Sequence, residues 1–204
     1  MKKIEFYKMS FDMDRIDETN KNGEQTIYAE TTNMDEYEDE EVKKGFFENT
    51  IFSKKEIKRW PEICFYYSSH ISDNESEYLL NVKRWPIVHS KVMTAFKKAE
   101  INGIRWYPIK LIDIETQKEN NDYYVMQIMN VIDAFDMEKS KFKYNAKYDF
   151  YTFIPEETYL NVDVCRKYDI FRCDKSLAAL YVSDKIKSMV QSNNWRGFYF
   201  YPQQ

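Results

Sequence analysis

Apolar residues recur at helical spacing in two stretches of the chain, and each series would line one face of a helix. They are Val92, Phe96 and Ala99 in the first stretch and Ile186, Met189 and Val190 in the second. Ser90 and Ser183 stand just before these stretches, where a hydroxyl suits an N-cap. Gly103 and Gly197 follow them, where a glycine accepts positive φ. The pattern therefore predicts two capped helices, each turning into an aromatic-rich strand.

These two stretches form an internal repeat, which spans residues 87–108 and 180–202. The serine and glycine are 13 residues apart in the first copy and 14 in the second, and a proline follows 5 residues after the glycine in both. Two copies are too few for a solenoid. We expect two similar helix–strand units within one fold.

Most of the remaining pattern predicts strands. A capping-box sequence, Ser53–Glu56, would open a short helix that Pro61 ends. Extended segments are expected at 63–67 and 142–153, in a hairpin of 104–114 with 123–131 around a turn at 116–122, and in a strand pair of 169–172 with 177–182. The predicted fold class is α+β, with a mainly antiparallel sheet and a few helices.

Charge divides the chain into two parts. Residues 1–50 hold 7 Lys/Arg and 14 Asp/Glu, whereas residues 51–204 hold 23 and 20. We therefore expect an acidic N-terminal region, 1–50, that precedes or packs on an α+β domain, 51–204.

In total the 204 residues are 43% hydrophobic and 31% charged, with net charge −4. The composition is that of a globular protein, and the net negative charge disfavours a dedicated nucleic-acid binder.

The acidity is concentrated in one run of six carboxylates and a tyrosine: Asp35, Glu36, Tyr37, Glu38, Asp39, Glu40 and Glu41. The plainer interpretation is a solvated loop or the first turn of a helix. The functional interpretation is a docking strip for a basic protein partner.

Motifs for catalysis or for a cofactor are not found. The chain lacks a nucleophile elbow, a Walker loop and a dinucleotide-binding glycine motif, and neither of its 2 histidines has metal-type spacing. We expect no metal, no cofactor and no catalytic residue. A site assembled from Ser90 or Ser183 with His70 or His89 is the alternative. The 3 cysteines, the lack of a signal-peptide core and the lack of a long apolar segment favour a cytoplasmic protein without membrane attachment.

Aromatic residues are abundant, with 4 Trp, 17 Tyr and 14 Phe. Most should lie in the core or in cross-strand pairs. Exposed members would suit a protein-binding patch. Trp60 and Trp85 lie close to basic residues, which is the best argument for a single-stranded nucleic-acid surface, a less favoured alternative.

The order of several segments resembles immunity-protein family eleven of bacterial polymorphic-toxin systems. The resemblance covers about residues 60–202. It rests on Gly103–Ile109, Tyr123–Ser140 with its Asp-x-x-x-Ser element, Ile170–Arg172, and the Val182–Ser183 and Gly197–Phe200 terminus. The shared residues are interpreted as structural: Ser90, Gly103, Asp133, Asp136, Ser140, Arg172, Ser183 and Gly197. Asp133, Asp136 and Ser140 would make local capping and turn hydrogen bonds, and Arg172 would be a buried salt-bridge partner.

The resemblance implies a cytoplasmic protein that binds and neutralises a cognate toxin by occluding it. The alternatives are an enzyme that reverses a toxin's modification and a nucleic-acid-associated protein. Neither the toxin nor the oligomeric state follows from the sequence. Because partner choice usually lies outside a shared scaffold, residues 35–41 are the predicted toxin contact.

Overall fold

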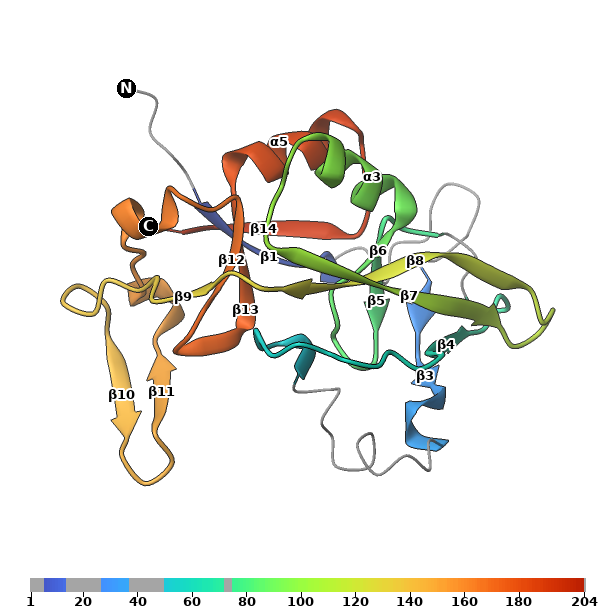
Figure 1. Ribbon diagram of the computed structural model, residues 1–204, viewed down its shortest axis with the longest axis horizontal. Helices are drawn as coiled ribbons and strands as arrows, with labels where there is room; N and C mark the ends of the chain where they lie inside the picture. The colour runs from blue at the N-terminus through green and yellow to red at the C-terminus, as the bar shows by residue number, and fades with distance from the viewer. Residues whose placement is uncertain (1–5, 14–26, 37–49, 72–74, 204) are drawn as a thin grey trace.

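The computed structural model describes residues 6–13, 27–36, 50–71 and 75–203. Within them lie a seven-stranded sheet ordered β2-β5-β6-β8-β7-β4-β3, a five-stranded sheet ordered β14-β1-β13-β12-β9, and a separate hairpin, β10-β11 (Figure 1). Most strand pairs are antiparallel; the pairs β2–β5, β4–β7 and β9–β12 are parallel. The predicted α+β class is confirmed.

The larger sheet consists of β2 (Tyr28–Ala29), β3 (Thr31–Thr32), β4 (Cys64–Tyr67), β5 (Tyr78–Asn81), β6 (Ile87–His89), β7 (Ile104–Asp113) and β8 (Glu119–Ile128). The smaller consists of β1 (Phe6–Phe11), β9 (Val131–Ile132), β12 (Ile170–Cys173), β13 (Ser176–Ser183) and β14 (Phe198–Gln203). The hairpin is β10 (Phe142–Asn145) and β11 (Phe150–Phe153). The helical elements are η2 (Asn33–Glu36), α3 (Ser90–Lys98), η3 (Pro155–Glu157), α4 (Val162–Cys165) and α5 (Asp184–Ser192).

The internal repeat forms two copies of one β-α-β arrangement. In the first copy β6, α3 and β7 follow one another, and β8 lies between the two strands and is antiparallel to both. In the second copy β13, α5 and β14 follow one another, and β1 takes the place between them. The middle strand therefore comes after the first unit in the sequence and before the second. The prediction of two similar units within one fold is confirmed.

The N-caps show that the two units are offset by 94 residues throughout, His89 matching Ser183 and Gly103 matching Gly197. The prediction of Ser90 as an N-cap is therefore wrong by one residue. His89 has an extended backbone, and its Nδ1 accepts a hydrogen bond from the Lys91 backbone N–H at 3.1 Å. An imidazole thus performs the capping, and Ser90 is the first residue of α3.

Ser183 is an N-cap by its backbone, but its hydroxyl makes no capping bond. The hydroxyl instead donates to the Asp169 carboxylate at 2.7 Å. The same carboxylate accepts from Lys185 at 3.1 Å, and Lys185 also donates to the Ala99 carbonyl at the end of α3 at 3.0 Å. This network ties the start of α5 to the end of α3.

Both helices end through a left-handed residue that is not glycine, Glu100 with φ 55° and Asn194 with φ 53°. Gly103 and Gly197 follow with φ 81° and 89°, as the prediction of positive φ requires. Their second role is close packing. A Cβ on Gly103 would lie against the Asn130 side chain, and one on Gly197 would lie against the Tyr78 carbonyl oxygen.

The main core lies beneath the two helices, which lie next to each other on one side of the molecule (Figure 1). Apolar residues from both helices and both sheets form this cluster, among them Val92, Phe96, Ile186 and Val190. A second cluster, which includes Trp85 and Tyr123, consists of apolar side chains from the strands of the larger sheet and the segments next to them. A third, around Phe135, Phe171 and Tyr181, lies beneath β12 and β13.

Two local predictions are corrected. Ser53–Glu56 is not helical: the Ser53 hydroxyl accepts from the Lys55 N–H at 3.2 Å, and the buried Gln127 amide donates to the Thr50, Ser53 and Lys55 carbonyls. Tertiary bonds therefore hold this segment as a turn.

The hairpin turn lies at 114–118 rather than 116–122, because Asp113 binds the Glu115 N–H and the Thr116 hydroxyl and closes the turn early.

The strand pair predicted at 169–172 and 177–182 is present as β12 and β13, and 63–67 is extended as β4. β1 belongs to the predicted acidic region but pairs with both β13 and β14. The division of the chain into two regions at residue 50 stays a prediction.

No helix among the described residues has the length and hydropathy needed to span a membrane.

Candidate functional site

The β10–β11 hairpin projects away from the body of the protein as a narrow arm (Figure 1). Its strands pair only with each other in the described part of the chain, Phe142 opposite Phe153 and Asn145 opposite Phe150. The arm and its base hold a group of strongly exposed apolar side chains, Tyr144, Tyr148, Phe150 and Ile154. Tyr148 and Phe150 are 69% and 57% exposed. Clustered exposed aromatics are typical of protein-binding surfaces.

One face of the arm is an aromatic ladder that begins in the core. Phe153 packs on the buried Phe135 with ring centroids 4.3 Å apart. From there the ladder continues through Phe142 and Tyr151 to Tyr144, with centroid distances of 5.4 Å and 4.7 Å. The ladder anchors the arm because its inner end, the half-buried Phe153, packs on the buried Phe135. The outer rings are exposed. An aromatic side chain has few rotatable bonds, so contact with a partner would cost little conformational entropy.

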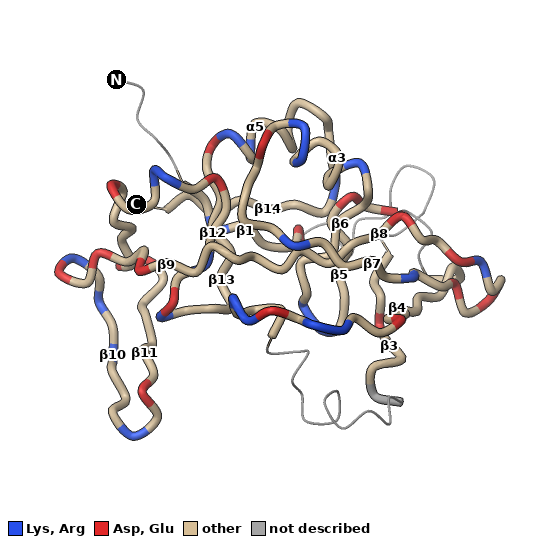
Figure 2. The backbone as a smooth tube through the Cα atoms, viewed as in Figure 1, with Lys and Arg blue, Asp and Glu red and all other residues tan. Residues whose placement is uncertain are grey.

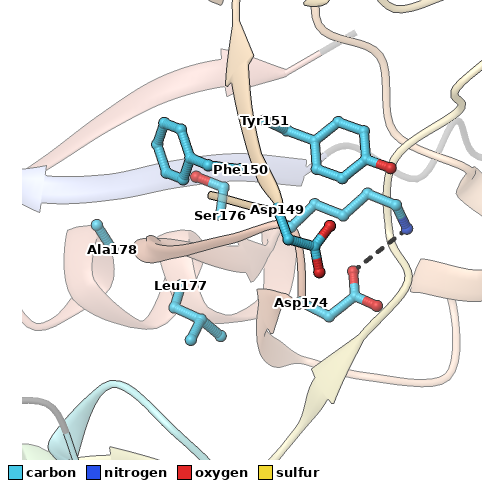
Figure 3. Close-up of a pocket in the computed structure, with 8 residues that line it drawn as sticks. Asp149, Phe150, Tyr151, Asp174, Ser176, Leu177 and Ala178 are labelled. Atoms are coloured by element: carbon cyan, nitrogen blue, oxygen red, sulfur yellow. Dashed lines mark ion pairs between the residues drawn. The ribbon is translucent and has the colours of Figure 1, made fainter. Parts of the chain in front are cut away.

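A cleft of about 610 Å³ lies between the arm and the turn that joins β12 to β13 (Figure 3). Asp149, Phe150 and Tyr151 line one wall, and residues 174–178 line the other. A second hollow of about 250 Å³ shares Phe150, Tyr151 and Ser176 with the first and extends toward Phe153 and Tyr181. The two hollows form one groove that follows β11.

The larger hollow, at the mouth of the groove, has two carboxylates and one ammonium in its lining, and that ammonium is ion-paired. Lys175 contacts the Asp133 carboxylate at 2.5 Å and the Asp174 carboxylate at 3.5 Å, the pair marked by a dashed line in Figure 3. Burial alone would lower the pKa of Lys175, but the hydrogen bond to Asp133 and the two carboxylates raise it. The Tyr144 hydroxyl donates to Asp149 at 2.8 Å, and this hydrogen bond raises the pKa of Tyr144. Asp149 and Asp174 thus outnumber Lys175 in the larger hollow, while Lys8 lines the second hollow.

Arg172 shapes the far wall of the groove. It lies in an irregular stretch where the register between β12 and β13 shifts, from Phe171 opposite Tyr181 to Cys173 opposite Ser176. The guanidinium is buried and donates to the carbonyls of Leu177 at 2.6 Å and Ala178 at 3.1 Å. Burial lowers its pKa to about 10. Its Cζ lies 5.0 Å from the Phe52 ring centroid.

The prediction of Arg172 as buried is confirmed, but the salt bridge is not found among the described residues, where carbonyls and an aromatic ring are its partners. Asp136 caps a turn by accepting from the Glu138 and Lys139 N–H groups, and Ser140 exchanges hydrogen bonds with the Tyr159 backbone. The local role of Asp136 matches the capping interpretation, whereas the hydroxyl of Ser140 has its partner 19 residues away. Asp133 departs from it, since it pairs with Lys175 across 42 residues of chain.

The acidic run falls almost entirely outside the described residues. Tyr37, Glu38, Asp39, Glu40 and Glu41 are not described, and Asp35 and Glu36 are described only as backbone in η2. The docking interpretation of residues 35–41 therefore stays a prediction. Sequence reasoning missed the arm because it predicted 142–153 as one strand. The signal was present in Asn145-Ala-Lys-Tyr-Asp149, whose polar residues interrupt the aromatic alternation.

The described residues do not form a site for the enzymatic alternative from the predicted serines and histidines. The Ser183 hydroxyl is bonded to Asp169, and His89 caps α3 while its Nδ1 lies 3.3 Å from the Ser90 hydroxyl. His70 is exposed and lies near Glu115 at 3.6 Å. Within the described ranges no three metal-ligating side chains come together.

The tryptophans do not form a base-stacking surface. Trp85 is fully buried, and Trp60 stacks on Tyr107 at 4.5 Å and donates to the Pro108 carbonyl. Trp106 and Trp195 pack against the main core. The expectation that most aromatics are structural holds for all four tryptophans.

Fold and site together define an α+β protein with a candidate binding surface, an exposed aromatic arm beside a groove whose mouth holds Asp149 and Asp174. The chain matches the model of the immunity protein family Imm11 over residues 5–204 and belongs to that family. The match extends the resemblance seen from about residue 60 onward to nearly the whole chain. No curated protein matches the sequence. The protein is therefore a toxin-neutralising immunity protein, and its family is not enzymatic in general.

Proposed function

We propose that this protein protects the bacterium that makes it by binding one cognate toxin of a polymorphic-toxin system in the cytoplasm and covering the toxin's functional surface. The arm carries this proposal. Exposed aromatics on a two-stranded sheet, anchored by Phe135 and Phe153, provide a large apolar area with little conformational entropy to lose.

The acidic run at 35–41 is a second proposed contact. If the toxin is a basic nuclease, six carboxylates would speed association and imitate the phosphates of its substrate. Replacing all six with amides should weaken binding and flatten its dependence on salt. Unchanged affinity and an unchanged salt slope would contradict this contact while leaving the arm as the binding surface.

The test of function is protection. Candidate toxin domains from the bacterium that makes this chain are expressed in a sensitive bacterium with and without the immunity protein, and each purified pair is titrated by calorimetry. We expect restored growth and a one-to-one complex. Growth restored without a complex would favour the enzymatic alternative, because reversal of a modification needs no lasting contact. Neither protection nor binding would overturn the proposal.

A further inference from the structure

The groove beside the arm runs along the edge of β11 and not along one of its faces. Side chains on a strand alternate between the two faces. Yet the four consecutive residues of β11, Phe150 to Phe153, all line the groove, and no residue of β10 does. Only a groove at the outer edge of β11 meets both faces in this way.

The open edge has identifiable backbone groups. Ile154 donates its N–H to the carbonyl of Lys141, which lies opposite it when the register of the hairpin is continued, so this is a hydrogen-bonded position of the ladder, although the Lys141 N–H itself donates to the Glu157 carbonyl. Since such positions alternate in an antiparallel ladder, Phe150 and Thr152 direct their N–H and carbonyl groups toward β10. Tyr151 and Phe153 direct theirs into the groove. Among the described strands, only β10 pairs with β11.

This edge lacks the usual protection against pairing. Exposed edges are commonly blocked by lysine or proline. From Phe150 to Ile154 the sequence is Phe-Tyr-Thr-Phe-Ile, without a charge or a proline. By contrast, β14 carries Pro202. An uncharged aromatic edge that lies in a groove is suited to pairing with a strand from another protein.

Charge indicates what the partner strand carries. The mouth of the groove holds Asp149 and Asp174, and the one ammonium there, Lys175, is already paired with Asp133 and Asp174 (Figure 3). Figure 2 shows an acidic segment along the β11 side of the arm. A segment with a lysine or arginine beside apolar residues complements this lining. An acidic segment would meet like charge.

We propose that an extended segment of the cognate toxin adds as a third strand to the open edge of β11 and places a basic side chain between Asp149 and Asp174. The inference rests on the proposed function and specifies how the partner is held. Backbone hydrogen bonds to Tyr151 and Phe153 provide part of the affinity, and the acidic mouth with the flanking rings selects the sequence.

A matched pair of variants isolates the backbone contribution. Tyr151→Pro removes both the ring and the outward N–H, whereas Tyr151→Ala removes only the ring. Proline is tolerated on an edge strand when its nitrogen faces away from the ladder. Asp149 has φ 48°, a conformation that asparagine accepts, so Asp149→Asn removes the charge and keeps the turn.

The probe is the purified toxin domain against which the protection assay shows this chain to be active. We expect Tyr151→Pro to bind it about 10-fold more weakly than Tyr151→Ala, and Asp149→Asn to bind more weakly than the unchanged chain with a smaller salt dependence. Amide hydrogen exchange on the unchanged chain is the second measurement. The Tyr151 and Phe153 amides should gain protection with toxin bound, while those of Phe150 and Thr152 serve as internal controls.

Failure of this inference differs from failure of the function. If the toxin binds but the Tyr151 and Phe153 amides exchange as in the free chain, strand addition is wrong and toxin binding stands. Equal affinities of the proline and alanine variants would likewise contradict strand addition alone. If the unchanged chain does not bind the toxin, both proposals fail. Should the proline variant unfold, the exchange measurement on the unchanged chain decides.

Discussion

The guanidinium of Arg172 donates a hydrogen bond to the carbonyl oxygen of Leu177 at 2.6 Å and so holds β13 where it bulges away from β12. A second bond reaches the Ala178 carbonyl. One buried side chain thus replaces the ladder bonds that the bulge removes. Leu177 and Ala178 in turn line the groove, so Arg172 shapes the proposed binding surface from inside.

Replacing Arg172 with methionine should destabilise the fold by about 3 kcal/mol, because the Leu177 and Ala178 carbonyl oxygens would stay buried without a hydrogen-bond donor. Urea unfolding gives the value. Arg166→Met is the control, since Arg166 is exposed and pairs only with Asp163 on its own helix, and it should cost less than about 0.5 kcal/mol. Equal small losses in both variants would show that the carbonyls find other donors.

Gly197→Ala should destabilise the protein by about 2 kcal/mol or more, as the residue combines positive φ with a close backbone neighbour. Gly103→Ala should cost less, because its Cβ would meet the Asn130 side chain, which can rotate away. Thermal unfolding of the two variants tests this order. The reverse order would mean that β5 moves more easily than Asn130.

Asp113 should contribute to stability in a pH-dependent way. Burial raises its pKa, but hydrogen bonds from Thr116, Ser69 and Glu115 outweigh burial and lower the pKa well below the ordinary value. The folded chain therefore releases this proton more readily than the unfolded chain. The stabilisation is complete above about pH 4 and is lost as the pH falls further. The gap in unfolding free energy between the unchanged chain and Asp113→Asn should narrow below pH 4; a constant gap would contradict the assignment.

The exposed rings of the arm should matter for binding and not for folding. Tyr144→Ser and Phe150→Ser should change the unfolding free energy by about 0.5 kcal/mol or less. Each should weaken toxin binding about 10-fold, as expected for aromatic residues at the centre of an interface. Tyr199→Ser, on β14, is the matched control and should bind normally. Loss of affinity in the control alone would move the binding surface to β14.

Local pattern was sufficient for most of the scaffold. Helical spacing of Val92 and Phe96 and of Ile186 and Val190 placed both helices, since only one face of each is buried. The N-cap of α3 was missed by one residue because imidazole is an uncommon cap. A strict comparison of the two copies at a constant offset would have found His89 opposite Ser183.

The capping box at Ser53–Glu56 shows where local pattern fails. Its residues favour a helix start, but the Gln127 amide, more than 70 residues away, binds the Ser53 and Lys55 carbonyls and the preceding Thr50 carbonyl. These hydrogen bonds, one buried and two partly buried, outweigh a weak helix propensity in so short a segment. A contact at such a separation leaves no periodicity in the sequence.

By itself the sequence determined the fold class, the duplicated helix–strand unit and the resemblance to an immunity family, because burial and capping impose regular spacings on neighbouring residues. Only the tertiary structure decided that the units share one core, that Arg172 serves carbonyls, and that β11 has an open edge beside Asp149 and Asp174. Those relationships join segments far apart in the chain. Their geometry depends on how sheets and helices pack, which no local pattern encodes.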